Sequence, residues 1–141
     1  MKSFFLFLLC SFVVGITASY AQNKAAGLPM DSTSKFPQIS FAQMKYDFGK
    51  VRKGEKVATA FHFKNTGMKP LQILQVQTTC GCTVTEWSKL IIPPNGTSEI
   101  SVIFDTTVKD MMGSQTKSLL VITNAKNKEV LLTLEGEIIK E

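Results

Sequence analysis

The feature of this sequence that most constrains its fold is the alternation of apolar and polar side chains in several short segments. Within residues 56–64, Val57, Phe61 and Phe63 share one parity. Successive side chains of a β-strand point to opposite faces of the sheet, so this pattern predicts a strand with one buried face. The same alternation recurs in two further segments, residues 98–105 and 130–138. The chain is therefore predicted to be built from half-buried β-strands.

Two other apolar segments do not alternate. Residues 118–123 form a continuous apolar run, which predicts a strand covered on both faces. In residues 71–78 the parity of the apolar side chains changes after Ile73. This change predicts either a β-bulge near Ile73 or a second strand covered on both faces.

Turn residues separate these segments at intervals of about 8–12 residues, which is typical of β-sandwiches. No stretch outside the N-terminal apolar run keeps a helical period. The segments amount to about seven strands in roughly 100 residues, the size of an immunoglobulin-like domain. We therefore predict an all-β chain folded as an immunoglobulin-like antiparallel β-sandwich, with a barrel of the same strand number as the alternative.

The N-terminal segment, residues 1–21, has the composition of a secretory signal peptide. Lys2 supplies its positive charge, residues 4–16 are uncharged and apolar, and Ser19 and Ala21 place small residues before a cleavage site. The apolar run is shorter than the about 20 residues that a membrane helix needs. We expect a secreted, periplasmic or cell-surface protein with no membrane span after cleavage, and an uncleaved N-terminal anchor is the alternative.

The next segment, residues 22–38, is polar, lacks periodicity and is interrupted by Pro29 and Pro37. Such a composition predicts a flexible linker between the cleavage site and the domain. The sandwich is therefore predicted to occupy residues 39–141.

The distribution of charge argues against binding to nucleic acid. The formal net charge of +5 falls to +4 once Lys2 leaves with the signal peptide. The lysines are scattered, and no run of five or six basic residues forms the stripe that a nucleic-acid-binding surface needs. We interpret the positive charge as a solvated surface.

Cys80 and Cys82 are the residues with the clearest chemistry, because they are the two cysteines left after export. An even number of cysteines in an exported protein favours a disulfide. Residues i and i+2 of an extended strand lie about 6.6 Å apart at Cα, at the upper limit for a disulfide, so a bend at Gly81 is expected. A disulfide that closes so small a loop contributes only about 1.6 kcal/mol to the stability of the folded state, against about 3 kcal/mol for a fifteen-residue loop.

Four interpretations of the cysteine pair remain open from the sequence. The first is a structural pair, either two buried thiols or a strained bridge, and the second is a redox-labile or intermolecular dithiol. The third is a Cu(I) site in which both thiolates and either His62 or a methionine bind the metal. The fourth is a nucleophilic dyad of Cys80 and His62. The methionines that qualify are Met30, Met44, Met68, Met111 and Met112.

Two further residues have simpler expected roles. Phe61 and Phe63 flank His62 and point to the opposite face of the predicted strand, so we expect the His62 side chain to face solvent. Trp87 is expected to pack in the core or at its rim.

Taken together, several short motifs between residues 44 and 139 resemble the secreted bacterial family of unknown function numbered 1573. The Asn-Thr-Gly turn and the Cys-Gly-Cys-Thr step are specific in combination. The matching pieces are Tyr46-Asp47-Phe48-Gly49, Gly54-Glu55, Phe61-His62-Phe63-Lys64-Asn65-Thr66-Gly67, Pro70-Leu71-Gln72-Ile73, Cys80-Gly81-Cys82-Thr83, Trp87, Ile92-Pro93-Pro94, Ile100-Ser101-Val102-Ile103-Phe104-Asp105, Thr123-Asn124 and Leu134-Glu135-Gly136.

This resemblance implies an immunoglobulin-like sandwich akin to Hydin-type and major-sperm-protein-type domains, which act as non-enzymatic scaffolds or adhesion modules. It implies no cofactor, no substrate and no catalytic residues. In Pro94-Asn95-Gly96 the sequence departs from the Pro-Gly expected for the family, and Asn95 is expected to keep the turn because asparagine tolerates a left-handed backbone.

Two functional hypotheses follow. The first is an exported, non-enzymatic domain that acts by contact with an envelope or extracellular protein, with the first and last strands as the expected docking edges. The second is a periplasmic thiol-redox or Cu(I)-binding protein that acts through Cys80 and Cys82.

Overall fold

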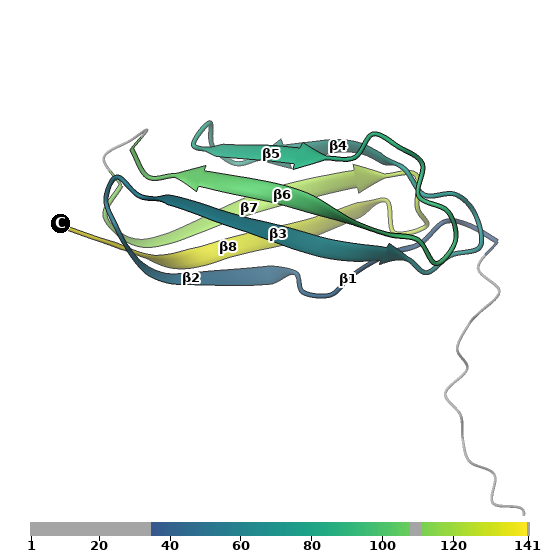
Figure 1. Ribbon diagram of the computed structural model, residues 1–141, viewed down its shortest axis with the longest axis horizontal. Coiled ribbons are helices and arrows are strands. Elements are labelled where there is room, and N and C mark those ends of the chain that lie inside the picture. Colours follow the sequence, from purple (N-terminus) through teal and green to yellow (C-terminus); the bar gives the residue numbers. More distant parts are fainter. Residues whose placement is uncertain (1–34, 108–110, 141) are drawn as a thin grey trace, which may run out of the picture. The chain divides into compact units, whose positions relative to one another are not determined.

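A computed structural model of the chain describes residues 35–107 and 111–140. The predicted signal peptide and most of the predicted linker lie outside these residues. The described part contains eight strands and no helix (Figure 1), and therefore no helix long and apolar enough to cross a membrane. The strands are β1 (Ile39–Phe41), β2 (Lys45–Arg52), β3 (Lys56–Asn65), β4 (Ile73–Thr78), β5 (Thr83–Trp87), β6 (Thr97–Asp105), β7 (Gly113–Thr123) and β8 (Glu129–Ile139).

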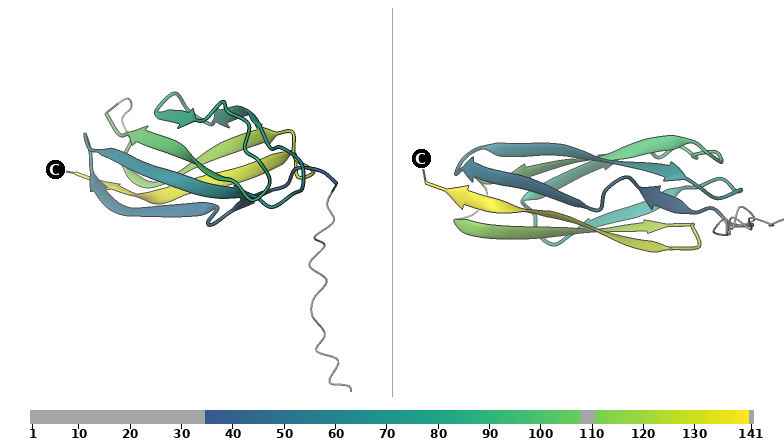
Figure 2. Two further views of the ribbon diagram at one scale, coloured as in Figure 1. Left: turned by 45° about the vertical axis from the view of Figure 1, so that its right-hand side comes forward. Right: turned by 90° about the horizontal axis from the view of Figure 1, so that it is seen from below.

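The strands form two four-stranded sheets that face one another (Figure 2). The first sheet has the order β1-β3-β6-β5 and the second has the order β2-β8-β7-β4. The predicted all-β sandwich is thus confirmed. The structure has eight strands rather than about seven because the N-terminal segment pairs first with β3 and then, as β2, with the other sheet.

One pair departs from the predicted antiparallel arrangement. Strand β2 runs parallel to β8, whereas every other pair of neighbouring strands is antiparallel. The reason is the passage of the N-terminal segment from one sheet to the other without reversing, which places β2 beside a strand of the same direction.

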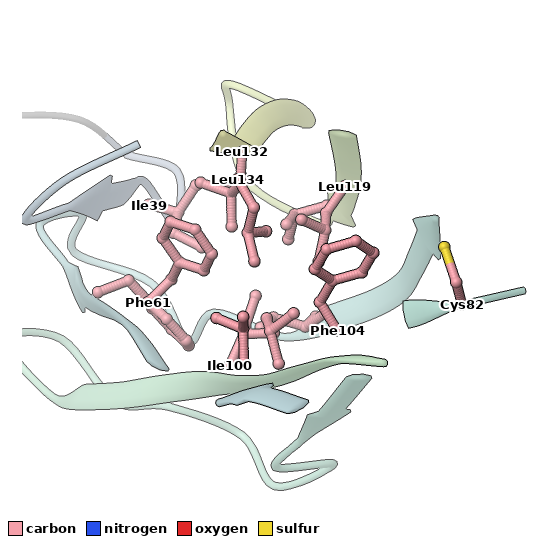
Figure 3. Packing of buried hydrophobic residues seen from close by; sticks show 14 of the residues in the cluster. Ile39, Phe61, Cys82, Ile100, Phe104, Leu119, Leu132 and Leu134 are labelled. Atoms are coloured by element: carbon pink, nitrogen blue, oxygen red, sulfur yellow. The ribbon is translucent and has the colours of Figure 1, made fainter. Parts of the chain in front are cut away.

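The core lies between the sheets and uses the alternating residues predicted from the sequence. Phe61 and Ile100 from the first sheet point toward Leu132 and Leu134 from the second (Figure 3). All four are fully buried. Burial of these apolar side chains, at about 25 cal/mol per Å² removed from water, is the main favourable term in the stability of the sandwich.

The two segments without simple alternation have different outcomes. A register shift between Ile73 and Gln75 in the pairing of β4 with β7 shows that the first alternative, a β-bulge, is correct. The prediction that residues 118–123 are covered on both faces is wrong. Leu119 and Val121 are fully buried, whereas Leu120 and Ile122 on the outer face are only half-buried, and no third layer of strands covers that face in the described part of the chain.

The last residues of the predicted linker lie against the sandwich. The carbonyl of Gln38 accepts a hydrogen bond from Thr66 N at 2.8 Å, and that of Pro37 accepts one from Lys126 N at 2.9 Å. Pro37 itself is buried. These contacts fix the direction in which the chain enters β1.

Candidate functional site

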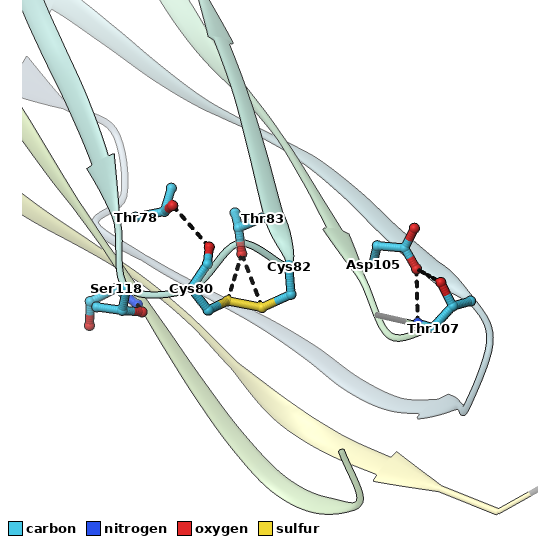
Figure 4. Close-up of a disulfide and its surroundings, with 8 residues drawn as sticks. Thr78, Cys80, Cys82, Thr83, Asp105, Thr107 and Ser118 are labelled. Atoms are coloured by element: carbon cyan, nitrogen blue, oxygen red, sulfur yellow. Dashed lines mark hydrogen bonds between the residues drawn. A yellow bond between two sulfur atoms is a disulfide. The ribbon is translucent and has the colours of Figure 1, made fainter. Parts of the chain in front are cut away.

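The two cysteines lie at the point where the chain passes from one sheet to the other. Strand β4 ends at Thr78 in the second sheet and β5 begins at Thr83 in the first, so residues 79–82 cross the edge of the sandwich. Cys80 and Cys82 are joined by a disulfide within this crossover (Figure 4), with their Cα atoms 5.3 Å apart. The crossover and the strand edges on either side of it form the candidate site.

The two sulfurs have different environments. Cys82 is only 1% exposed and belongs to the buried cluster, beyond Phe104 in Figure 3, whereas Cys80 is partly exposed. The Thr83 hydroxyl lies 3.7 Å from Cys80 Sγ and 4.0 Å from Cys82 Sγ. Because a disulfide sulfur carries no proton, the hydroxyl is the donor in these weak contacts.

Hydrogen bonds hold the crossover independently of the disulfide. Thr79 N donates to Ser118 O on β7 at 3.2 Å, and Asp105 N on β6 donates to Cys82 O at 2.9 Å. The Thr78 hydroxyl donates to Cys80 O at 3.0 Å. The crossover is therefore anchored to both sheets.

The bend expected at Gly81 is present, because the Cα atoms of Cys80 and Cys82 lie 5.3 Å apart rather than the about 6.6 Å of an extended strand, but it does not require glycine. The φ angle of Gly81 is not positive, in contrast to those of Gly49, Gly54 and Gly113. A Cβ atom added at Gly81 would meet no atom within 4 Å. The bend that closes the disulfide is thus one that other residues can adopt.

A carboxylate lies on the strand next to the crossover. The Thr107 hydroxyl and backbone N–H donate to Asp105 Oδ1 at 2.6 and 2.8 Å, and these bonds hold the pKa of Asp105 below its ordinary value. Lys56 Nζ forms an ion pair with Asp105 Oδ2 at 3.2 Å. The carboxylate is therefore ionised and paired at neutral pH.

The structure does not bring His62 to the cysteines. His62 is exposed, as expected, and its Nδ1 lies 3.2 Å from Glu99 Oε2 on the outer face of the first sheet. Thr83, the residue after Cys82, pairs with Phe104 on β6, and Phe104 pairs with Val57 on β3, so Val57 marks the level of the cysteines. His62 lies five residues further along β3. At about 3.3 Å per residue this separation is about 16 Å along the strand.

Neither the metal site of Cys80, Cys82 and His62 nor the Cys80–His62 dyad is therefore assembled. Within residues 35–107 and 111–140, no three His, Cys, Asp or Glu side chains are grouped as metal ligands. Met30 lies outside the described residues. Trp87 packs partly buried against the core, as expected, and Lys89 Nζ lies 3.2 Å from the centroid of its ring.

Four strands form the edges of the sheets in the described part of the chain: β1, β5, β2 and β4. The last strand, β8, is therefore not an edge, contrary to the expectation from the sequence. It lies between β2 and β7 because the N-terminal segment adds β2 outside it. The first strand is an edge, but it has only three residues.

Natural proteins protect sheet edges with charges, bulges or short strands. Strand β2 carries Lys45, Lys50 and Arg52, and β5 carries Glu86. Strand β4, with the sequence ILQVQT, is the one edge of these four that is longer than three residues and has no charged side chain. Its irregular pairing lies at its start, so residues 75–78 form a regular edge.

The hydrogen bonds of β4 follow an alternating pattern. Thr79 N donates to Ser118 O, and partners that exchange hydrogen bonds recur at every second residue of an antiparallel pair. The backbone groups of Gln75 and Gln77 therefore face β7. Those of Val76 and Thr78 point away from β7, toward the open edge.

Exposed apolar side chains accompany this edge. The backbones of Leu71 and Ile92 exchange hydrogen bonds of 2.9 and 2.8 Å, which brings Leu90 and Ile91 to the start of β4. Leu90 is 76% exposed, Ile91 is 63% exposed and Leu74 is 56% exposed. We call Leu74, Leu90, Ile91 and the backbone of residues 75–78 the β4 edge.

The strand order, with an N-terminal segment shared between two facing sheets, defines an immunoglobulin-like β-sandwich domain. Residues 39–138 match the family DUF1573, described as proteins of unknown function, and the chain belongs to this family. The resemblance seen in the sequence motifs is thus confirmed. No curated protein matches the chain in sequence.

Solved structures with similar folds are distant in sequence. A protein of unknown function from Porphyromonas gingivalis W83 has a TM-score of 0.65 at 18% identity, over 75% of this chain and 48% of that protein. The secreted serine protease VesC from Vibrio cholerae has a TM-score of 0.55 at 15% identity, over 71% of this chain and 23% of the protease. This chain thus spans less than half of either protein.

A third similar structure is the ASH / PapD-like domain of human CEP192, with a TM-score of 0.59 at 11% identity. The match covers 78% of this chain and 89% of that domain. At these identities the three likenesses show the fold alone, and the functional argument depends on the geometry of this chain.

Proposed function

We propose that this chain is an exported, non-enzymatic interaction module that binds an extended segment of a partner protein along the β4 edge. The observation that carries the proposal is an uncharged edge strand whose backbone groups at Val76 and Thr78 point away from its sheet. An added strand would pair with these groups, which is a recurring mode of peptide recognition.

The chemistry of the edge specifies the segment that fits it. A charged segment would find no opposite charge on β4, because its six residues carry none. Exposed Leu74, Leu90 and Ile91 offer apolar surface at one end of the strand. The occupant we propose is therefore an uncharged, extended segment of a partner polypeptide with apolar side chains at alternate positions, which is the spacing that a strand presents to one face.

Two features support export to the periplasm or cell surface. Residues 1–21 have the composition of a signal peptide, and a disulfide joins the two cysteines of the domain. We expect the protein recovered outside the cytoplasm to begin at Gln22, and its intact mass measures this directly. A chain that keeps residues 1–21 or stays in the cytoplasm would contradict the proposed location.

The arrangement of reactive side chains supports a non-enzymatic role. In the described part of the chain, His62 pairs with Glu99 on an exposed face, about 16 Å along β3 from the level of the cysteines. The likeness to a serine protease covers 23% of that protein and concerns the fold. General acid–base or nucleophilic catalysis needs such groups within hydrogen-bond reach of one another.

The proposal is tested by placing a lysine on the edge. First, a photo-crosslinking residue at exposed Gln77 captures the partner in cells that produce the protein. The purified partner is then titrated with the wild type and with Leu74→Lys. Burial of a leucine contributes about 1.5–3 kcal/mol, so the charge is expected to weaken binding at least about tenfold.

Leu131→Lys is a matched control, because Leu131 is also 56% exposed and lies on the outer face of the same sheet, on the central strand β8. This variant is expected to bind as the wild type does. Equal binding by both variants, or equal loss in both, would show that the β4 edge is not the docking site.

A further inference from the structure

We propose that the Cys80–Cys82 disulfide is a site of thiol–disulfide exchange, at which the thiol of a cysteine in another exported polypeptide becomes bonded to Cys80. The inference concerns the crossover and goes beyond the docking proposal, and it does not require a strand to bind at β4.

The difference in exposure between the two cysteine residues determines which sulfur is attacked. A thiolate approaches a disulfide along the sulfur–sulfur axis and bonds to the sulfur that it can reach. Cys80 is partly exposed at the surface of the crossover, whereas Cys82 is 1% exposed and packs in the buried cluster. Attack at Cys80 is therefore favoured.

The exchange is balanced without an external oxidant. The thiolate of the incoming cysteine forms a bond to Cys80 Sγ while the bond between the two protein sulfurs breaks. The electron pair of that bond leaves on Cys82 Sγ, which then takes a proton from water. The incoming thiol has already released its own proton to water, so protons balance. One disulfide is replaced by another, and the product is a mixed disulfide at Cys80 with a free thiol at Cys82.

The fold does not depend on the bond that breaks. The bridge spans a sequence separation of only two residues, and so small a loop restricts the unfolded chain little. The crossover is held to β7 by the Thr79–Ser118 hydrogen bond and to β6 by the Asp105–Cys82 hydrogen bond, and neither involves a sulfur. Strands β4 and β5 are therefore expected to keep their places when the disulfide opens.

Burial of Cys82 also makes the captured state persist. A cysteine in apolar, buried surroundings is far less reactive than an exposed one. The thiol released at Cys82 is therefore slow to attack the mixed disulfide and expel the captured chain. The Thr83 hydroxyl, 4.0 Å from Cys82 Sγ, supplies a weak polar contact to the released sulfur. The arrangement favours capture of a partner over rapid turnover.

The test uses the mature wild-type chain with two probes, reduced glutathione and a reduced peptide that contains one cysteine. Alkylation of free thiols followed by fragmentation mass spectrometry distinguishes an adduct at Cys80 from one at Cys82, because Gly81 separates them. We expect mixed disulfides with both probes, at Cys80 and with Cys82 alkylated. A disulfide that stays intact under excess thiol, or adducts divided equally between the two cysteines, would overturn the proposal.

Two single variants provide a second measurement. Cys82→Ala leaves Cys80 alone and Cys80→Ala leaves Cys82 alone, and both are incubated with oxidised glutathione. The adduct is expected to form at least about tenfold faster on Cys80 than on Cys82, with unchanged circular dichroism. Equal rates in two folded variants would contradict the inference. Both measurements use small thiols and no docking partner, so failure of the docking proposal would leave their results unchanged.

Discussion

Replacing Asn65 with alanine is expected to lower the free energy of unfolding by about 3 kcal/mol or more. Asn65 is fully buried, and its Nδ2 donates to Lys69 O at 2.8 Å and to Ile92 O at 3.0 Å. Its Oδ1 accepts from Gly67 N at 3.0 Å and Gln38 N at 3.4 Å. Each buried backbone group left without a partner costs about 1–3 kcal/mol, against a total stability of about 5–15 kcal/mol for a domain.

The measurement is equilibrium unfolding in urea, with Asn124→Ala as the control. Asn124 also makes two side-chain hydrogen bonds, to Gln72 N and Pro70 O, but it is exposed, so water can replace its amide. The control is expected to lose about 1 kcal/mol or less. Equal destabilisation of the two variants would show that the buried hydrogen bonds of Asn65 contribute no more to stability than the exposed ones of Asn124.

Gly136→Ala is expected to destabilise the domain by about 1–3 kcal/mol through overpacking. A Cβ atom there would overlap the ring of Phe48 and would lie 2.7 Å from Gly49 O. Neither neighbour can move freely, because Phe48 packs 5.6 Å from the Phe104 ring and Gly49 holds a left-handed backbone beside the register shift of β2.

Gly81→Ala is the control for this substitution, since a Cβ at Gly81 meets nothing within 4 Å and its φ is not positive. Its stability is expected to stay within about 0.5 kcal/mol of the wild type. Urea unfolding of both variants provides the comparison. A Gly136→Ala variant that is as stable as the wild type, or no less stable than Gly81→Ala, would show that the close approach of β2 to β8 is not the constraint.

These two sites explain what the sequence motifs mean physically. The Asn-Thr-Gly turn is specific because Asn65 binds four backbone groups and because a side chain at Gly67 would overlap the backbone of residues 36–38. The Asp-Phe-Gly and Leu-Glu-Gly segments meet where the Phe48 ring covers Gly136. The motifs were visible in the sequence, but the contact between distant segments was not.

The alternation in β3, β6 and β8 was sufficient to predict the sandwich, because strand periodicity follows directly from which side chains are buried. It could not predict the order of the strands. The parallel pairing of β2 with β8 depends on the N-terminal segment changing sheets, and no local pattern encodes this. For the same reason the sequence pattern does not show that the last strand, β8, lies inside its sheet.

The candidate site was predicted in part. Cys80 and Cys82 were recognised as a pair, and the structure joins them, but the separation of His62 follows from the pairing register of β3 with β6. The sequence alone does not identify the β4 edge, although the lack of charge in residues 73–78 is visible in it. That signal acquires meaning only when the strand is known to be an edge.

The most direct test of the docking proposal is residue-by-residue amide hydrogen exchange of the domain with and without its bound partner. The amides of Val76 and Thr78 point to the open edge, so we predict fast exchange in the free domain and strong protection in the complex. The amides of Gln75 and Gln77 already face β7 and should change little. Protection confined to β1, β2 or β5, with Val76 and Thr78 still exchanging fast, would contradict the account.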